Sequence, residues 1–502
     1  MKDVHGQVDA CPFPGLPAFD ERYAAVYFGR ERETQTVLEE LRQMRSKGEP
    51  RLLMIVGGSG SGKSSLLMAG VLPRLKHTTS RSEWLVLPTL RFGRRDDDDA
   101  LFETLADDIV ARYPKDAIAK GVIIPDRKTL RVQFAAEDTA QAAKAFQDAT
   151  RDLIFACGCQ DATVLLPVDQ FEEFLAPSAG ARATKFLKFL EQVCQHRNDR
   201  LLVIGTMRSD YLDVYERHPH ALKAPKFHPW RLEPFPREQI ENVIVKPAER
   251  VHVEIADDLL EQLKQETPTT DALPLLAFTL EKLYRSHAGD KKLELSEYRS
   301  LGGMEGSIKH TAEQIMPVNS LPPNVESAVR LSFVKHLAQV NDKGKFVRLT
   351  ARWKDLDAVA YPVLEQFVSQ RLLMKTDRDG EVSLEVAHEA IFRSWEQLNT
   401  WLHTSADILR WRRDVRRSQE TAQANHQSWS GLSGPQLAVS RDWPEKRRQE
   451  LSTDEVRWIE TAILRSRIWT GLAITVALVI TTLGAVAWWE KGVADAKTQV
   501  AV

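Results

Sequence analysis

The segment from Arg51 to Met68 constrains the fold more than any other part of the chain. Five apolar residues, 52–56, run into the string GGSGSGKSS, and an apolar pattern with helical spacing begins at Leu66. This order predicts a buried strand, a glycine-rich loop and the start of a helix. The loop can curl so that backbone N–H groups point at the β- and γ-phosphates of a nucleotide, while the helix N-terminus adds its positive dipole end. A flexible Gly/Ser linker is the alternative, but a linker would not lie between two apolar segments of different period.

Two side chains of this loop carry most of the predicted chemistry. Lys63 supplies a mobile positive charge to the phosphates, and the hydroxyl of Ser64 is a ligand for Mg²⁺. The other positions predicted to bind the nucleotide are Gly57, Gly58, Ser59, Gly60, Ser61, Gly62 and Ser65. We therefore expect a site for ATP or ADP with Mg²⁺ at this loop.

Length and composition limit the classes of protein to which the chain can belong. Its 502 residues are enough for roughly three domains, each with its own core. The 68 Lys and Arg residues balance 70 Asp and Glu residues, so no overall positive charge attracts nucleic acid, and no specific nucleic-acid partner is expected. The four cysteines match neither a zinc pattern nor a disulfide framework, which indicates reduced cytosolic thiols: Cys11, Cys157, Cys159 and Cys194. The first residues lack the apolar run of a signal peptide.

Residues 468–489 contain no charged side chain and predict a single membrane-spanning helix. At about 1.5 Å per residue this segment covers a hydrocarbon core of about 30 Å, and tryptophans stand at both of its ends. A buried core helix is the alternative. Basic residues precede the segment at six positions: Lys446, Arg447, Arg448, Arg457, Arg465 and Arg467; after it stand only Lys491 and Lys497. The positive-inside rule therefore predicts a single-pass protein of the inner (plasma) membrane, with residues before the span in the cytoplasm and the tail outside.

A second apolar strand is predicted at 163–168, and it ends in Asp169. A carboxylate at this place is what a phosphate-loop enzyme needs opposite Ser64 to hold Mg²⁺, so Asp169 is the Walker B candidate. Pro167 removes one ladder donor and predicts a local irregularity in the strand. Glu172 and Glu173 are both candidates for the base that activates water, and the sequence does not choose between them.

Other patterns place the remaining elements. A strand is expected at 83–92, and a further one at 201–206 delivers Arg208 toward the γ-phosphate pocket, where it could sense or stabilise charge. From 237 to 315 the period is helical. Residues 372–386 alternate as two strands around the turn at Asp379 and Gly380, and a helix is expected from His388 to Trp401.

Residues 403–466 are charged and helical in pattern. The arginines Arg410, Arg412, Arg413, Arg416 and Arg417 surround Trp411, an aromatic interleaving that could suggest nucleic acid. Acidic and Ser/Gln residues flank the run, which favours a solvated helical stalk that leads toward the membrane.

Several of these motifs together resemble one family. The string FGRERE at 28–33 resembles the FGRE segment of STAND proteins, signal-transduction ATPases with numerous domains, and PFPGLPAF at 12–19 is similar to the opening of the novel STAND NTPase family. The string DQFEEF at 169–174 is similar to the Walker B block of that family, although Gln170 stands where many wider relatives place the glutamate that activates water.

The resemblance implies roles for further residues. It places Phe28, Gly29 and Arg30 on the adenine side of the pocket and makes Arg208 a sensor arginine. Pro274 lies in a string similar to the GxP motif of the STAND helical lid, with Ala272 in place of the glycine, and a kinked core helix is the alternative. His388 stands where STAND chains carry a histidine that contacts the bound diphosphate. The alternative for His388 is a helix cap.

The predicted fold class is an α/β P-loop NTPase with an ASCE-type parallel sheet, followed by a helical lid, a winged-helix domain, a helical stalk and one C-terminal transmembrane helix. The expected boundaries are 1–50 for an N-terminal segment with the FGRE motif, 51–235 for the NTPase domain, 236–315 for the lid, 316–402 for the winged helix, 403–466 for the stalk, 468–489 for the transmembrane helix and 490–502 for the tail.

The resemblance implies a membrane-anchored ATP-binding switch in bacterial signalling or defence. Such a switch is ADP-bound at rest, ATP-bound and homo-oligomeric when active, and a slow Mg²⁺-dependent ATPase. Relatives usually carry a sensor, often a WD-repeat propeller, or an effector domain; neither is visible, and the tail resembles the start of a helix that leads into one. The trigger and output are not indicated. Two other functions stay open: a DNA-handling P-loop ATPase with a winged helix, and a membrane adaptor with a degenerate nucleotide site.

Overall fold

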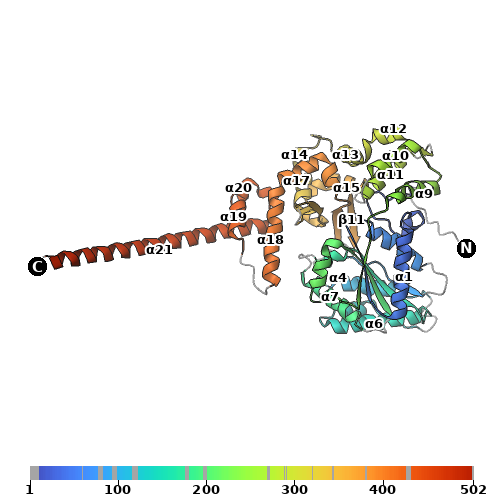
Figure 1. Ribbon diagram of the computed structural model, residues 1–502, viewed down its shortest axis with the longest axis horizontal. Coiled ribbons are helices and arrows are strands. Elements are labelled where there is room, and N and C mark those ends of the chain that lie inside the picture. The colour runs from blue at the N-terminus through green and yellow to red at the C-terminus, as the bar shows by residue number, and fades with distance from the viewer. Residues whose placement is uncertain are drawn as a thin grey trace. The chain divides into compact units, whose positions relative to one another are not determined.

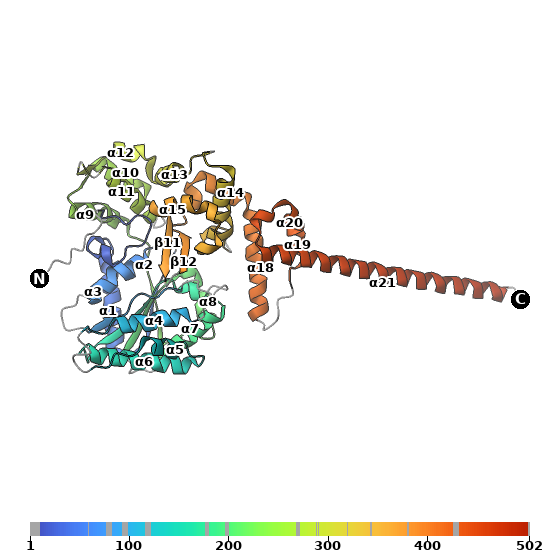
Figure 2. The same cartoon turned by 180° about the vertical axis from the view of Figure 1, so that it is seen from behind.

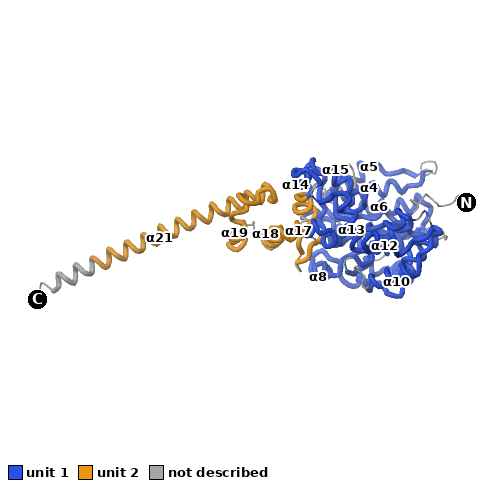
Figure 3. The backbone as a smooth tube through the Cα atoms, turned by 90° about the horizontal axis from the view of Figure 1, so that it is seen from above, with its two compact units in different colours: residues 1–329, 348–399 blue, residues 330–347, 400–502 orange. Residues whose placement is uncertain are grey.

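The computed structural model describes most of the chain as two compact units (Figure 3). The first comprises residues up to Val329 together with Arg348–Asn399, and the second comprises Arg330–Val347 together with the residues from Thr400 onward. The expected winged-helix range, 316–402, is therefore divided between the units. The described residues are 11–58, 60–76, 83–92, 99–115, 122–175, 180–195, 200–267, 272–287, 289, 291–318, 320–341, 344–378, 381–424 and 431–499. The expected site residue Ser59 and the expected turn at 379–380 lie outside them.

A five-stranded parallel sheet organises the first unit (Figure 1). Its order is β2-β3-β4-β1-β5, with bounds Trp84–Val86, Thr163–Val168, Leu201–Arg208, Leu52–Gly57 and Phe227–Arg231. The strand β4 thus lies between the glycine-loop strand β1 and the Walker B strand β3. The strand expected at 83–92 is shorter than predicted, and its chain returns to the sheet only through a bridge between Leu90 and Val168.

Both faces of this sheet are covered by helices (Figures 1 and 2). Alternate residues of β1 enter two different cores: Leu53 and Ile55 pack with one set of helices, and Leu52, Met54 and Val56 pack with the other. The first set is α1 (Glu31–Lys47), α2 (Lys63–Ser65), the π-helical turn η2 (Leu66–Val71) and α3 (Leu72–Lys76). The second is α4 (Ala100–Ala111), α5 (Arg127–Phe134), α6 (Thr139–Ala156) and α7 (Gly180–Val193). Burial on both faces explains why these strands are continuous apolar runs.

A short helix, α8 (Leu212–Arg217), precedes β5. Helices follow β5, as the period predicts: α9 (Ile240–Arg250), α10 (Asp257–Glu266), α11 (Leu273–His287), α12 (Leu295–Ser300) and α13 (Gly303–Ile315). Two short parallel strands, β6 (Glu254–Ile255) and β7 (Lys292–Leu293), join the lid segments.

The last part of the first unit contains a three-stranded sheet of order β10-β12-β11. Its strands are Ala351–Arg352, Glu381–Val386 and Leu373–Arg378, and the neighbouring helices are α14 (Pro323–Leu331) and α15 (Tyr361–Ser369). The helix expected from His388 to Trp401 is wrong, because the chain forms two helices, α16 (Ile391–Ser394) and α17 (Glu396–Thr404). Trp395 between them has extended backbone, with φ −92° and ψ 103°, and its buried ring packs 5.1 Å from the ring of Phe367. The break places this large side chain in the core.

The second unit has its own core and differs from the solvated stalk expected there. It contains η10 (Ser332–Leu337), β8 (Ala338–Val340), most of β9 (Phe346–Arg348), α18 (Ala406–Ala424), α19 (Gly434–Ser440), α20 (Trp443–Lys446) and α21 (Thr453–Gln499). Its buried apolar residues are Ile408, Trp411, Val415, Trp443, Leu451, Val456 and Ile459. Trp411 packs edge to face on Trp443, with 5.6 Å between ring centroids.

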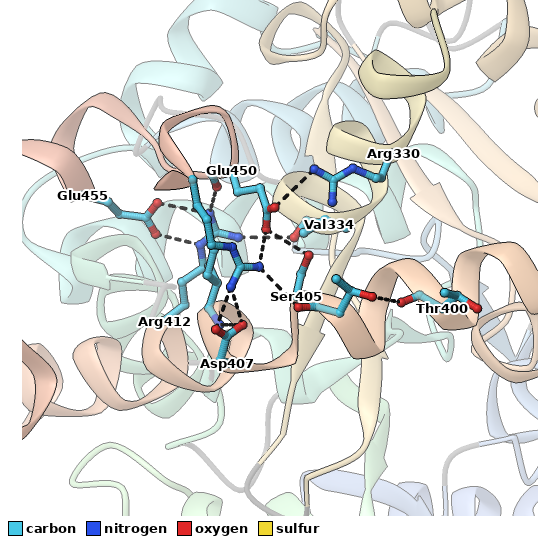
Figure 4. A network of polar contacts seen from close by, with 11 residues as sticks. Arg330, Val334, Thr400, Ser405, Asp407, Arg412, Glu450 and Glu455 are labelled. Atoms are coloured by element: carbon cyan, nitrogen blue, oxygen red, sulfur yellow. Dashed lines mark hydrogen bonds and ion pairs between the residues drawn. The ribbon is translucent and has the colours of Figure 1, made fainter. Parts of the chain in front are cut away.

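A network of ion pairs and hydrogen bonds joins several segments of this unit (Figure 4). The Arg412 Nε donates to Glu455 Oε1 at 2.7 Å, and both side chains are mostly buried. Glu450 accepts from Arg330 at 3.2 Å and from Ser405 at 2.9 Å. Arg412 therefore holds helices together instead of facing solvent, whereas Arg410 and Arg417 of the same run are exposed as expected.

The helix α21 continues without a break from this core through the expected span at 468–489. Its segment Thr453–Trp489 is long and apolar enough to cross a membrane, and its most apolar stretch is exposed. The helix is a candidate span by length and composition.

Candidate nucleotide site

The glycine loop wraps around the ammonium group of Lys63. The Lys63 Nζ donates to the carbonyl oxygens of Gly57 at 3.1 Å and Gly58 at 2.6 Å. Gly60 and Gly62 have φ of 74° and 87°, a region that favours glycine, so the loop needs these residues to curl. Burial lowers the pKa of Lys63, and the positive charge of Arg208 acts in the same direction, whereas Glu172 opposes it.

The loop leaves polar groups that fit a phosphate. Ser61 Oγ is buried and has no hydrogen-bond partner in the part of the chain that the structure describes. Residues 63–76 form a continuous helical segment after the loop, and the first backbone N–H groups of a helix lack intrahelical partners. An orphaned hydroxyl, helix N–H groups and one ammonium group are the donor set that a nucleotide phosphate requires.

Ser64 and Asp169 meet, as a shared Mg²⁺ site would require. The Ser64 Oγ donates to Asp169 Oδ1 at 2.7 Å, and Asp169 is fully buried. Burial alone would raise the pKa of Asp169, but the charge of Arg91 and the hydrogen bonds outweigh it and hold that pKa below its usual value. Within the described residues no cluster of three or more metal-binding side chains occurs. Ser64 and Asp169 offer oxygen atoms, the type of ligand that Mg²⁺ binds together with waters and nucleotide phosphates.

Two further residues bind the same carboxylate, and the sequence analysis missed both. The Thr206 Oγ1 donates to Asp169 Oδ1 at 2.6 Å and accepts from the backbone N–H of Gln170 at 2.9 Å. The Arg91 Nη2 donates to Asp169 Oδ2 at 2.6 Å. A threonine near the end of the apolar run of β4 was a signal in the sequence, whereas Arg91 had none beyond its place after a strand.

The structure places the two candidate bases in different surroundings. Both belong to the 3₁₀ helix η4 (Phe171–Leu175). The residue before this helix, Gln170, has a left-handed backbone conformation with φ 60°. Burial raises the pKa of Glu172, while the charges of Lys63 and Arg208 lower it, and its Oε2 accepts from the Arg208 N–H at 3.3 Å. Burial, followed by the negative charges of Glu385 and Glu172, raises the pKa of Glu173 to about 8. Glu172 thus faces the phosphate loop, and Glu173 faces another carboxylate.

Arg208 lies at the loop edge of the sheet. It pairs in register with Gly57 across β4 and β1, so the sheet itself brings it to the glycine loop. Its guanidinium is held by Asp210, with Nε at 3.1 Å and Nη2 at 2.9 Å from the carboxylate oxygens. Its Nε and Nη2 are the nitrogens that bind Asp210, and a role of Arg208 in sensing the γ-phosphate stays a prediction.

The segment from Phe28 to Arg30 is joined to the glycine loop. Arg30 is buried, and its Nη2 donates to the carbonyl oxygens of Ser61 at 3.4 Å and Glu233 at 3.1 Å. Gly29 has φ 85°, and a Cβ there would lie 2.7 Å from the ring of Phe235, so only glycine fits. Phe28 lies beside the cationic groups of α9.

The other expected site residues lie as follows. The Ser65 Oγ accepts from the Phe19 N–H at 3.1 Å, which ties the N-terminal segment to the glycine loop. Pro274 lies in the first turn of α11, and its contact with a base stays a prediction.

His388 is partly buried and lies just before α16 in this structure. Its Nδ1 accepts from the Ala390 N–H at 3.1 Å. Burial lowers the pKa of His388 to about 3, and the positive charges of Arg348 and Arg393 act in the same direction. The next residue, Glu389, is among the carboxylates whose charge acts on Arg208. A bond from His388 to a diphosphate stays a prediction.

Comparison with known proteins gave one family and several remote structures. The family model described as Novel STAND NTPase 1 matches residues 12–430. The comparison with curated protein sequences gave no significant match. A Walker-type ATPase of Pyrococcus abyssi is 14% identical, with 75% of this chain and 97% of that chain covered and a TM-score of 0.38. The Aeropyrum pernix ORC2 protein, in ADPNP–ADP complexes, is 12% identical, with 76% and 95% covered and a TM-score of 0.41. The Aeropyrum pernix ORC1 protein in complex with DNA is 13% identical, with 76% and 96% covered and a TM-score of 0.39.

Proposed function

The chain belongs to the Novel STAND NTPase 1 family, and on that premise we propose that it is a membrane-anchored, ATP-dependent signalling switch. In this proposal ADP occupies the resting form, and ATP occupies an active form that assembles into a homo-oligomer. The observation that carries the nucleotide site is the contact of Ser64 with Asp169 at 2.7 Å, beside a lysine enclosed by the glycine loop. Support for the membrane anchor is the exposed apolar part of α21.

In this proposal, different residues of the site bind the phosphates, bind Mg²⁺ and orient the attacking water of a slow ATPase. Lys63 and the helix N-terminus would hold the phosphates, while Ser64 and Asp169 would hold Mg²⁺, which neutralises charge on the phosphates when it is bound. Glu172 is the better candidate to orient the attacking water because of its position: its Oε2 accepts from the Arg208 N–H at 3.3 Å, whereas the charge of Glu385 acts on Glu173. Glu173, with its pKa near 8, carries a proton at neutral pH and cannot accept another.

Nucleotide-dependent stability tests the proposal. With Mg²⁺ and ATP at a hundred times the dissociation constant, the full chain in detergent micelles should gain about 2.7 kcal/mol of stability. Lys63→Ala should remove this gain, whereas Lys47→Ala, at an exposed lysine in the last turn of α1, should keep it. A gain that persists in Lys63→Ala would refute the assigned site. No gain in the wild type would favour a degenerate nucleotide site.

A further inference from the structure

The backbone places Arg91 beside Asp169. Leu90 precedes it, and the Leu90 N–H donates to the carbonyl oxygen of Pro167 at 2.8 Å. The Leu90 carbonyl oxygen in turn accepts from the Asp169 N–H at 2.9 Å. These two bonds extend the sheet beyond the end of β2, so the position of Arg91 next to Asp169 is set by the main chain and does not depend on the arginine side chain alone.

The two oxygens of Asp169 have separate donors. Both Nε and Nη2 of Arg91 reach Oδ2, at 3.0 Å and 2.6 Å. The hydroxyls of Ser64 and Thr206 both reach Oδ1. These four donors fill the roughly four lone-pair sites of the carboxylate, so a bound Mg²⁺ would reach Oδ1 where the Ser64 hydroxyl turns from the carboxylate to the ion. Any rotation of the Asp169 carboxylate would break hydrogen bonds on both oxygens, and the arginine therefore fixes its plane.

Arg91 makes a second contact through the same nitrogen that binds Asp169. Its Nη2 lies 3.8 Å from Met68 Sδ, in the helical segment that follows the glycine loop. The carboxylates of Glu385 and Glu173 also act on its charge. The Arg91 side chain is 27% exposed, whereas Asp169 is fully buried, so the arginine lies at the rim of the site and the aspartate at its base.

We propose that Arg91 is a positioning residue for the Mg²⁺–nucleotide site, holding the Asp169 carboxylate so that Oδ1 is presented to Ser64. The proposal rests on the nucleotide site proposed above. Arg91 does not take the place of the ion, because it binds Oδ2 and leaves the oxygen on the Ser64 side to the hydroxyls. A competitor of the ion would have the opposite effect when it is removed, so the sign of the effect decides between the two roles.

Metal-dependent melting of the full chain in detergent micelles tests this role. At saturating ADP, Mg²⁺ is titrated and its half-saturating concentration is read from the metal-dependent part of the thermal shift. Arg91→Met should raise that concentration at least tenfold. In EDTA, without Mg²⁺, the ADP concentration that half-saturates the thermal shift should stay within twofold of the wild-type value. Arg91→Lys keeps the charge but not the two-nitrogen fork, so it should raise the concentration at least threefold.

The control is Arg131→Met, which removes the guanidinium of another arginine–aspartate pair. Arg131 of α5 pairs with Asp107 of α4, and both lie far from the glycine loop in sequence. It should leave the half-saturating Mg²⁺ concentration unchanged. An unchanged or lower value in folded Arg91→Met would overturn the proposal, and Arg91→Lys decides in the same way if Arg91→Met does not fold. A wild-type chain that shows no shift with ADP and Mg²⁺ would instead overturn the nucleotide site, and the role of Arg91 with it.

Discussion

Glu173→Gln should make the protein more stable at high pH while leaving it unaffected at low pH. Burial and the neighbouring carboxylates of Glu385 and Glu172 raise the pKa of Glu173 from 4.5 to about 8. Below that value the folded protein carries a neutral Glu173, which glutamine resembles in charge and size. Above it the wild type must place a negative charge next to Glu385, and the variant avoids that cost.

The sign and size of the effect follow from proton linkage. Between pH 4.5 and about 8 the folded state keeps a proton that the unfolded chain has released, so the stability of the wild type falls as pH rises. Each pH unit in this window costs up to about 1.4 kcal/mol, and the whole window at most about 5 kcal/mol. Because the side chain keeps some contact with solvent, which screens its charge, we expect about 2–3 kcal/mol between pH 5 and pH 9.

Urea unfolding of the nucleotide-free wild type and variant at pH 5, 7 and 9 measures this difference. All other titrating groups are common to both proteins, so the difference in unfolding free energy isolates Glu173. Glu238→Gln, at an exposed glutamate of the same unit, is the matched control and should show no trend. The reasoning would be refuted if the difference in unfolding free energy stayed constant with pH, or if the wild type became more stable relative to the variant as pH rises.

Two other substitutions test the switch and the second unit. If His388 binds the diphosphate in the closed form, His388→Ala should lose about 1.5–3 kcal/mol of that contact and release ADP at least tenfold faster. An unchanged release rate would leave His388 only as the acceptor for the Ala390 N–H. Arg412→Met should lower the unfolding free energy of the second unit by about 3 kcal/mol, because Glu455 is left buried without its partner. Adding Glu455→Met should recover most of this loss in thermal melts, and a single variant that melts like the wild type would contradict the pair.

The parts of the site that local sequence determines were predictable. The apolar run before the glycines predicts β1, and the apolar run that ends in Asp169 predicts β3, because each strand is recognised within six residues. The sequence also indicated that Ser64 and Asp169 would meet, since strands of a parallel sheet end at one edge. Arg91 could not be found in this way. Its partner lies 78 residues further along the chain, and only the bridge at Leu90 brings the two together.

The second unit shows why charge alone misled the interpretation of 403–466. From the sequence alone, each arginine in this segment is expected to face solvent, but Arg412 forms an ion pair with Glu455 of a different helix. The pattern did contain a signal, because Ile408, Trp411 and Val415 recur at helical spacing and form one apolar face of α18. The aromatic residue that could have suggested nucleic acid is part of this core, and its Nε1 donates to the Gln436 carbonyl oxygen at 3.0 Å. An apolar stripe in a charged helix is therefore good evidence that the helix packs against others. The charged residues are weaker evidence that the helix is solvated, because long charged side chains can reach partners from the edge of a buried face.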